Sequence, residues 1–159
     1  MTKKKPVYLI LSDVRSSQNV GAIFRTADGA GVDKIILAGI TPAPKDKFGR
    51  VNPKIAKTAL GAEKIIPWES VSSVSRAINN LKKGKFFVVA LEQSKNSIDY
   101  KKLKPKYPLA LIVGNEISGV PKNILKKCDA IIEIPMRGQK ESLNVSVAMG
   151  VALFRILKV

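Results

Sequence analysis

The sequence predicts an α/β fold in which a mostly parallel sheet is flanked by helices. Short apolar runs rich in β-branched residues recur along the chain, and each is typical of a strand buried on both faces. Segments of helical character lie between most of these runs, and this alternation is typical of parallel α/β sheets. At 159 residues the chain has the size of one domain, so we expect residues 1–159 to form a single domain around one core.

The expected elements follow these patterns in chain order. The strands are predicted at residues 7–11, 34–38, 63–66, 86–91, 109–113 and 130–134, and the helices at residues 19–29, 53–60, 69–82, 121–126 and 142–157. Gly29 and Gly31 are expected to end the first helix, and Pro121 suits the start of the fourth. The last helix is strongly apolar, which predicts burial on most of its faces. The basic, Pro-containing loops at 39–53 and 95–108 are expected to be flexible.

The chain is strongly basic, with 28 Lys and Arg against 12 Asp and Glu and a formal net charge of +16. The lysines are spread along the chain, so we expect a basic surface and a polyanionic partner such as nucleic acid. The chain has no His and one cysteine, Cys128. This composition excludes Ser-His-Asp triads, Cys/His zinc sites and intramolecular disulfides, and we expect no metal.

The apolar segments are short. None approaches the roughly 20 apolar residues that a membrane span needs. The first apolar run ends at Ser12 and Asp13 and is too short for a signal peptide. We therefore expect a cytoplasmic protein that does not enter a membrane.

Three loops that follow predicted strands carry more polar residues than packing requires. Ligands of parallel α/β sheets bind at the carboxyl ends of the strands, where such loops lie. The first loop, RSSQNVGAIFRTADGAGV, presents Asn19 and Arg25. Taken alone, this loop is better explained without a ligand, with Asn19 as a helix cap and Arg25 as a solvated surface charge.

The second loop, LIVGNEISGVP, places Gly114 and Gly119 on either side of Asn115 and Glu116. This pattern suits a tight loop whose backbone approaches a ligand closely, and it also suits a plain turn before Pro121.

The third loop, IIEIPMRGQKESLNVSVAMGV, brings Ser142, Asn144 and Ser146 to the start of the last helix. One of Ser142 and Asn144 is enough to cap that helix, so the other is expected to line a polar pocket.

In order and in spacing, the segment from Asn19 to Arg25, GNEISG and IPMRGQKESLNVS resemble the three signature motifs of the SpoU/TrmH branch of the SPOUT methyltransferases. Members of this family use S-adenosylmethionine to methylate a ribose 2'-hydroxyl of RNA. The resemblance covers nearly the whole chain and implies this activity on tRNA or rRNA, together with a C-terminal trefoil knot. It also implies a homodimer with a composite active site, in which Arg25 of one subunit reaches the cofactor site of the other.

The resemblance also assigns the candidate site residues. The catalytic candidates are Arg25, Asn19, Glu116, Ser142 and Asn144, and the positions that match cofactor-binding residues are Leu91, Gly114, Ile134, Ser142 and Leu143. A guanidinium keeps its proton at neutral pH, so we expect Arg25 to orient the hydroxyl and stabilise the developing alkoxide instead of acting as a base. Asn19 and Asn144 are expected to position Arg25 and the ribose. Glu116 is expected to hold its loop or to pair with an arginine.

Target recognition is assigned to the domain itself. Many relatives carry an N-terminal RNA-binding domain, whereas Tyr8 already lies in the first predicted strand, so we expect no separate RNA-binding extension. The candidate RNA-binding residues lie in and beside the long loop at 39–53 and are Lys45, Lys47, Arg50 and Lys54. Only 6% of the residues are aromatic, so we expect no extensive base-stacking platform and a recognition dominated by shape and phosphate contacts.

Two alternative functions stay open. A non-catalytic RNA-binding protein that keeps the fold would be expected to have lost Arg25, Glu116 or Asn144, and all three are present. Methyl transfer to an RNA base, as in other SPOUT branches, is less consistent with the SLNVS signature, which favours ribose.

Overall fold

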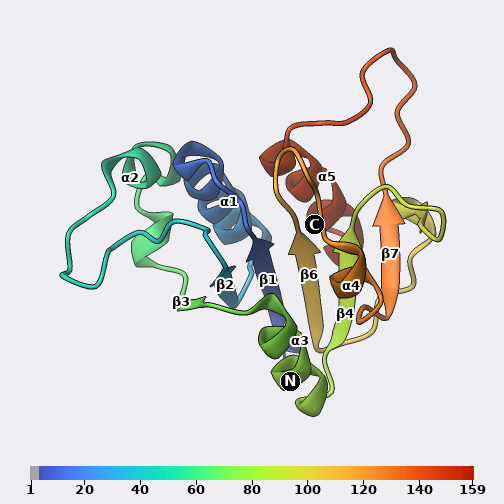
Figure 1. Ribbon diagram of the computed structural model, residues 1–159, viewed down its shortest axis with the longest axis horizontal. Coiled ribbons are helices and arrows are strands. Elements are labelled where there is room, and N and C mark those ends of the chain that lie inside the picture. Colours follow the sequence, from blue (N-terminus) through green and yellow to red (C-terminus); the bar gives the residue numbers. More distant parts are fainter. Residues whose placement is uncertain (1–3) are drawn as a thin grey trace.

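The computed structural model describes residues 4–159 (Figure 1). Within this range one seven-stranded sheet has the order β3-β2-β1-β6-β4-β7-β5, and each pairing between neighbouring strands is parallel. The strands are β1 (Val7–Ser12), β2 (Lys34–Ala38), β3 (Trp68–Val71), β4 (Phe87–Leu91), β5 (Ile98–Asp99), β6 (Leu109–Val113) and β7 (Ala130–Glu133). The helices are α1 (Ser17–Ala30), α2 (Pro53–Ala59), α3 (Val74–Lys83), α4 (Lys122–Leu125) and α5 (Val145–Leu157), with 3-10 turns η1 (Ala62–Lys64) and η2 (Tyr100–Lys102). The predicted α/β fold with a mostly parallel sheet is confirmed.

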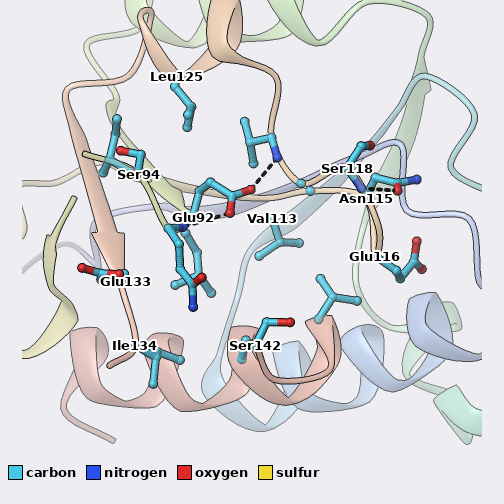
Figure 2. A pocket seen from close by; sticks show the side chains of 18 of the residues that line it. Glu92, Ser94, Val113, Asn115, Glu116, Ser118, Leu125, Glu133, Ile134 and Ser142 are labelled. Carbon is cyan, nitrogen blue, oxygen red and sulfur yellow. Dashed lines mark hydrogen bonds between the residues drawn. The ribbon is translucent and has the colours of Figure 1, made fainter. Parts of the chain in front are cut away.

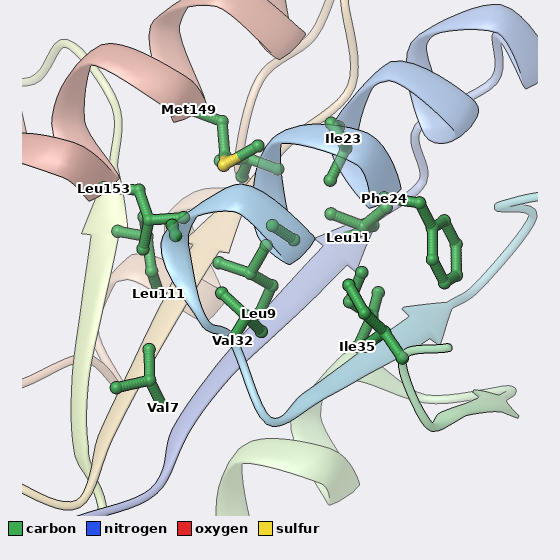
Figure 3. Packing of buried hydrophobic residues seen from close by; sticks show 14 of the residues in the cluster. Val7, Leu9, Leu11, Ile23, Phe24, Val32, Ile35, Leu111, Met149 and Leu153 are labelled. Atoms are coloured by element: carbon green, nitrogen blue, oxygen red, sulfur yellow. The ribbon is translucent and has the colours of Figure 1, made fainter. Parts of the chain in front are cut away.

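One face of the sheet packs against α1, α2 and α5. Successive side chains of a strand point to opposite faces, so Leu9 and Leu11 of β1 meet this layer together with Leu111 of β6. Figure 3 shows Ile23 of α1 and Met149 of α5 closing over them, and all of these side chains are fully buried. Such burial contributes roughly 1.5 to 3 kcal/mol per large apolar side chain. This layer therefore anchors the two helices whose N-termini carry the first and third motifs.

The opposite face is covered by α3 and α4. The alternate residues of the same strands, such as Ile10 of β1 and Ile112 of β6, pack there against Ile78 of α3 and Ile124 of α4. Because β1, β6 and β4 are covered on both faces, their sequences are continuous apolar runs, and this is why the sequence located them correctly.

The predicted strand at residues 63–66 is wrong. This segment forms η1 and a following turn, in which the Glu63 carboxylate accepts a hydrogen bond of 3.0 Å from the Gly61 N–H. The strand lies instead at β3, which pairs only with β2 and leaves Glu69 and Ser70 exposed. An edge strand with a solvated face lacks the continuous apolar run that identified the central strands.

The predicted helix at 69–82 is correspondingly too long at its start. The Ser73 side chain caps α3 by accepting a hydrogen bond from the Arg76 N–H, and the helix begins at Val74. At the last helix the cap is Asn144 and not Ser142, so α5 begins at Val145.

The loop predicted at 95–108 contains regular structure. It includes β5, which pairs with β7, and the turn η2. The loop at 39–53 contains an antiparallel bridge between Lys45 and Val51. Across residues 4–159 no helix has the length and apolarity needed to cross a membrane. The trefoil knot that the resemblance implies stays a prediction.

The sheet brings the three motifs to one end. In Figure 1 the arrows of β1, β6 and β7 point the same way, and the loops after them lie together at the top. These loops contain the start of α1, the segment after β6 and the segment that leads into α5. This is the end of a parallel sheet at which ligands bind.

Candidate functional site

A pocket of about 970 Å³ opens at the carboxyl ends of β4, β6 and β7 (Figure 2). Its walls come from the loops that follow these strands and from the first turns of α5. The volume lies at the upper end of the range of roughly 300 to 1,000 Å³ that is typical of small-molecule sites.

The pocket collects most of the residues that the sequence predicted. Every predicted cofactor-binding position lines it, as do three of the catalytic candidates. The lining positions among the predicted residues are Leu91, Gly114, Glu116, Ile134, Ser142, Leu143 and Asn144. Asn19 and Arg25 are not among the lining residues.

The loop after β6 is a tight, internally bonded turn. Asn115 and Gly119 exchange backbone hydrogen bonds of 3.2 and 2.9 Å, and Gly119 has φ +68°, a conformation that favours glycine. The Asn115 side chain accepts hydrogen bonds from the Ile117 and Ser118 N–H groups and donates one of 2.8 Å to the Asp13 carbonyl. The loop is thereby fixed to the end of β1.

A carboxylate that the sequence analysis missed holds the other end of this loop. Glu92, directly after β4, accepts hydrogen bonds of 2.7 Å from the Val120 N–H and 2.9 Å from the Gln93 N–H (Figure 2). The Gln93 amide in turn donates a hydrogen bond of 2.7 Å to the Glu141 carbonyl. A charged residue at the carboxyl end of a buried strand was the available signal for Glu92.

Glu116 joins the second motif to the first. Its carboxylate accepts hydrogen bonds of 3.1 Å from the Arg15 N–H, 3.0 Å from the Ser16 N–H and 3.2 Å from the Asn19 side-chain amide. Partial desolvation raises the pKa of this carboxyl, but the hydrogen bonds from Ser16, from its own N–H, from Arg15 and from Asn19 outweigh it. The net effect is a pKa below the ordinary value of 4.5. Of the two expected roles, Glu116 thus holds its loop against the start of α1, and within residues 4–159 it makes no ion pair with a guanidinium.

Asn19 connects Glu116 to the third motif. The Asn144 amide donates a hydrogen bond of 3.2 Å to the Asn19 side-chain oxygen. The Asn144 oxygen accepts bonds from the Ser146 N–H at 2.9 Å and the Ser146 hydroxyl at 2.6 Å, and so caps α5. A continuous network from Glu116 through Asn19 to Asn144 therefore joins all three motifs within one chain. The cap of α1 is Ser16, so the alternative in which Asn19 caps this helix is wrong.

Of the two candidates for the cap of the last helix, the structure has Asn144, and both residues line the pocket. Asn144 caps the helix, and Ser142 is exposed on the pocket wall.

Arg25 lies away from this pocket. It is exposed on α1, which packs against α2 and α5, and its position is two turns after the cap at Ser16. A single chain therefore does not bring Arg25 to the cofactor candidates.

The predicted RNA-binding residues occupy a separate place. Lys45, Lys47 and Arg50 are exposed in the loop between β2 and α2, and Lys54 is exposed at the start of α2. None of them lines the pocket. These residues form a basic patch beside the N-terminal turn of α1. Asn52 connects their loop to this turn by donating a hydrogen bond of 3.1 Å to the Ser17 hydroxyl.

Charged side chains of both signs line the pocket. They are the carboxylates of Glu92, Glu116, Glu133 and Glu141 and the ammonium groups of Lys95, Lys122 and Lys126. Their formal charges nearly cancel, so the pocket lacks the strong positive excess of the chain as a whole. Within residues 4–159 there is no group of three or more His, Cys, Asp or Glu side chains arranged to hold a metal ion.

The chain resembles known proteins over almost its full length. The SpoU rRNA Methylase family matches residues 6–154. The 23S rRNA (guanosine-2'-O-)-methyltransferase RlmB of Pseudomonas aeruginosa is 37% identical over 153 residues, which are 96% of this chain and 59% of that protein. The chain thus spans about 59% of the length of the curated relatives that it matches.

Solved structures show the same fold. The AdoMet-bound rRNA methyltransferase from Sinorhizobium meliloti superposes with a TM-score of 0.86 at 28% identity and covers 99% of this chain and 58% of that one. The TrmH/SpoU tRNA modifying enzyme of A. aeolicus gives a TM-score of 0.83 at 31% identity, with 98% and 76% of the two chains covered.

Proposed function

Because the chain belongs to the SpoU rRNA Methylase family, we propose that it methylates a ribose 2'-hydroxyl of rRNA or tRNA with S-adenosylmethionine as the methyl donor. The donor, when bound, supplies a sulfonium methyl whose carbon–sulfur bond breaks as the bond from the ribose oxygen to the methyl carbon forms, while the hydroxyl proton passes to solvent.

The observation that carries this proposal is one pocket lined by the second and third motifs, to which the first motif is joined by the hydrogen bonds of Asn19. The pocket lies at the carboxyl ends of parallel strands, and all predicted cofactor positions line it. Its lining of carboxylates and lysines offers partners for the sulfonium, ammonium and carboxylate groups of the donor, and its size suits a nucleoside ligand. A relative at 28% identity is described as AdoMet-bound.

We assign positioning roles to the hydrogen-bonded side chains. Glu116 holds the N-terminus of α1, and Asn19 and Asn144 fix the relative placement of the first and third motifs. Ser142, exposed on the pocket wall, is placed to contact the donor or the ribose. Rigid placement is the main requirement of a displacement reaction, in which the attacking oxygen, methyl carbon and sulfur must be aligned.

The proposal includes a homodimer. Val147 and Val151 are one helical turn apart on α5 and are 52% and 40% exposed, and Leu143 beside the pocket is 38% exposed. An exposed apolar stripe of this kind is typical of an interface. Because α1 packs against α5, a partner on this stripe would meet Arg25. We propose that Arg25 then reaches the partner's pocket, where its fixed positive charge stabilises the developing alkoxide.

The first experiment measures transfer of labelled methyl groups from S-adenosylmethionine to under-methylated rRNA and tRNA, followed by digestion to nucleosides. We expect a labelled 2'-O-methylnucleoside with the wild-type chain and a loss of at least about 100-fold with Arg25→Ala, since removing one electrostatic stabiliser costs on the order of 10²- to 10³-fold. Donor binding by Arg25→Ala should be nearly unchanged. Arg76→Ala on α3 is the matched control, because Arg76 is also exposed on a helix but lies on the opposite layer.

Other outcomes identify the alternatives. Label on a base would place the protein among base methyltransferases. Absence of label from both RNAs, with donor and RNA binding intact, would favour the non-catalytic RNA-binding protein. Normal turnover by Arg25→Ala would contradict the role of Arg25.

Subunit mixing tests the composite site. The variants Arg25→Ala and Gly114→Val, the second a change in the pocket, should each be inactive as homodimers. A mixed dimer contains one complete site, formed by the intact pocket of the Arg25→Ala subunit and the intact Arg25 of the Gly114→Val subunit. Random mixing should restore about a quarter of wild-type activity, because half of the dimers are mixed and each has one good site. No recovery in dimers that have demonstrably exchanged subunits would show that Arg25 acts within its own chain.

A further inference from the structure

The loop between β2 and α2 exposes an aromatic ring that no packing explains. Phe48 is 71% exposed, and it is the only exposed residue among the Trp, Tyr and Phe side chains within residues 4–159. In Figure 1 this loop extends away from the sheet beside α2. Exposure of a large apolar ring is unfavourable in water, so its position on a protruding loop calls for a contact.

The loop is built to hold this ring in place. One Asp46 carboxylate oxygen accepts hydrogen bonds of 2.9 Å from the N–H groups of both Phe48 and Arg50. The Gly49 N–H donates a bond of 3.0 Å to the Asp46 carbonyl, and Gly49 adopts φ +78°, which allows the turn. The bridge between Lys45 and Val51 closes the base of the loop.

The surroundings of the ring are cationic. The Lys47 ammonium and the Arg50 guanidinium each lie 5.1 Å from the ring centroid, within cation–π distance. Arg50 is fixed by an ion pair of 2.7 Å from its Nε to Asp46, whereas Lys47 makes no ion pair within the described part of the chain. The acidic residue of the loop is thus neutralised by Arg50, and the charge left at the tip is positive.

We propose that Phe48 is a stacking platform for an unpaired nucleobase of the RNA substrate, with Lys47 and Arg50 contacting the phosphates next to that base. An aromatic face beside mobile and fixed cations is the chemistry with which proteins bind single-stranded nucleic acid. A base that stacks on the ring takes the place of the Lys47 ammonium, which is free to move to a phosphate. Arg50 stays in position because Asp46 holds it.

The loop is also coupled to the catalytic end of the molecule. Asn52 ends the loop, caps α2, and donates a hydrogen bond of 3.1 Å to the Ser17 hydroxyl in the first turn of α1. Asn19, two residues further on, belongs to the network that joins the three motifs. A base held on Phe48 is therefore positioned relative to the pocket through the start of α1. This inference rests on the proposed function in that it takes RNA as the partner.

The test compares Phe48→Ala, Phe48→Leu and Phe48→Trp in binding to a fluorescently labelled RNA hairpin with an unpaired uridine-rich loop. Two matched probes are a fully paired duplex of the same length and the hairpin with abasic loop nucleotides. We expect the wild type and Phe48→Trp to bind the hairpin about equally, and Phe48→Ala and Phe48→Leu to bind it about ten-fold more weakly. Binding of the duplex and the abasic hairpin should be the same for all four proteins, because phosphate contacts remain.

Stacking is read directly with 2-aminopurine in the hairpin loop. Its fluorescence should change on binding to the wild type and Phe48→Trp but not to Phe48→Leu. Equal hairpin affinity of all four proteins, or failure of the wild type to bind the hairpin, would overturn the proposal. Loss of dimerisation in Phe48→Ala that Phe48→Leu restores would also overturn it, because the ring would then pack against a second copy.

The methyl-transfer assay separates this proposal from the proposed function. If the wild type binds the hairpin through the Phe48 ring but transfers no methyl group, the stacking site stands and the proposed activity fails. If methyl transfer occurs and the ring does not affect binding, the activity stands and the stacking site fails.

Discussion

At the scale of single residues, Glu116 shows how a carboxylate that lines a candidate site can have a structural role. Its oxygens accept two backbone N–H groups and an amide, so the ionised form is held by three directed bonds. These bonds lie at the junction of the first two motifs, where Glu116 joins the loop after β6 to the start of α1. The residue that the sequence analysis placed among the catalytic candidates is thus supported by the geometry as a positioning residue.

The lowered pKa of Glu116 predicts a pH dependence of stability. A carboxyl whose folded pKa is depressed contributes stability above its unfolded pKa, near 4.5, and loses it as the pH falls through the folded pKa. We expect the wild type to exceed Glu116→Gln in free energy of unfolding by about 1 kcal/mol near pH 7, a modest value because the side chain is exposed and screened. Near pH 3 the difference should shrink. Urea titrations at both pH values measure it, and a pH-independent gap would contradict the assigned cause.

At the scale of elements, the close approach of α1 and α2 depends on Gly21. A Cβ at this position would meet the Thr58 hydroxyl and the Ile55 carbonyl of α2. Since backbone cannot yield as a flexible side chain does, Gly21→Ala should destabilise the fold by about 2 kcal/mol. Thermal denaturation should show the loss as a lower Tm.

Gly29 provides the control on the same helix. A Cβ there would lie 3.8 Å from the Phe154 ring, an ordinary contact, so Gly29→Ala should be neutral or stabilising by up to about 1 kcal/mol through helix propensity. Equal effects of the two substitutions would show that the spacing of α1 and α2 does not limit stability.

The strands that the sequence predicted correctly are those whose apolar pattern has one explanation, burial on both faces of the sheet. Residues of β1, β6 and β4 are buried on both faces, and their apolar runs left little ambiguity. Residues 63–66 also end in two apolar residues, but a local hydrogen bond determines their structure. The Glu63 carboxylate accepts this bond from the Gly61 N–H, and the chain forms η1 there. In the edge strand β3 two consecutive residues, Glu69 and Ser70, are exposed between two half-buried ones. The segment therefore lacks the alternation typical of a strand, and the sequence predicted the start of a helix there.

The candidate site was predicted in part. The second and third motifs identified most of the predicted pocket residues because their types and spacing are specific, and membership of the family confirms that recognition. Glu92 was missed although it follows a buried strand, because the two backbone N–H groups that it binds cannot be read from the sequence. The loop of Phe48 was predicted to bind RNA through its cations. The role of the ring was missed, because its exposure and its distance from those cations appear only in the structure.

At the scale of the whole molecule, charge is divided unevenly between the pocket and the rest of the surface. The net charge is +16, yet the charged residues that line the pocket are four glutamates and three lysines. Under the proposed function, the basic surface outside the pocket attracts the phosphate backbone of RNA. Lys45, Lys47, Arg50 and Lys54 belong to this surface and are all exposed.

This division predicts a steep salt dependence of RNA binding. Six to ten phosphate contacts would weaken binding by roughly 10³- to 10⁵-fold between about 50 and about 200 mM salt, because each contact releases condensed counterions. Lys54→Gln should lower the slope of log K against log salt by about one if Lys54 contacts a phosphate, and Lys83→Gln at the end of α3 should lower it less. Donor binding should respond to salt much less, because a small donor molecule does not carry the condensed counterions that RNA releases on binding. The slopes are measured by fluorescence anisotropy. Equal slopes for Lys54→Gln and the wild type would show that Lys54 contacts no phosphate, and the proposed RNA contacts would then centre on Lys47 and Arg50.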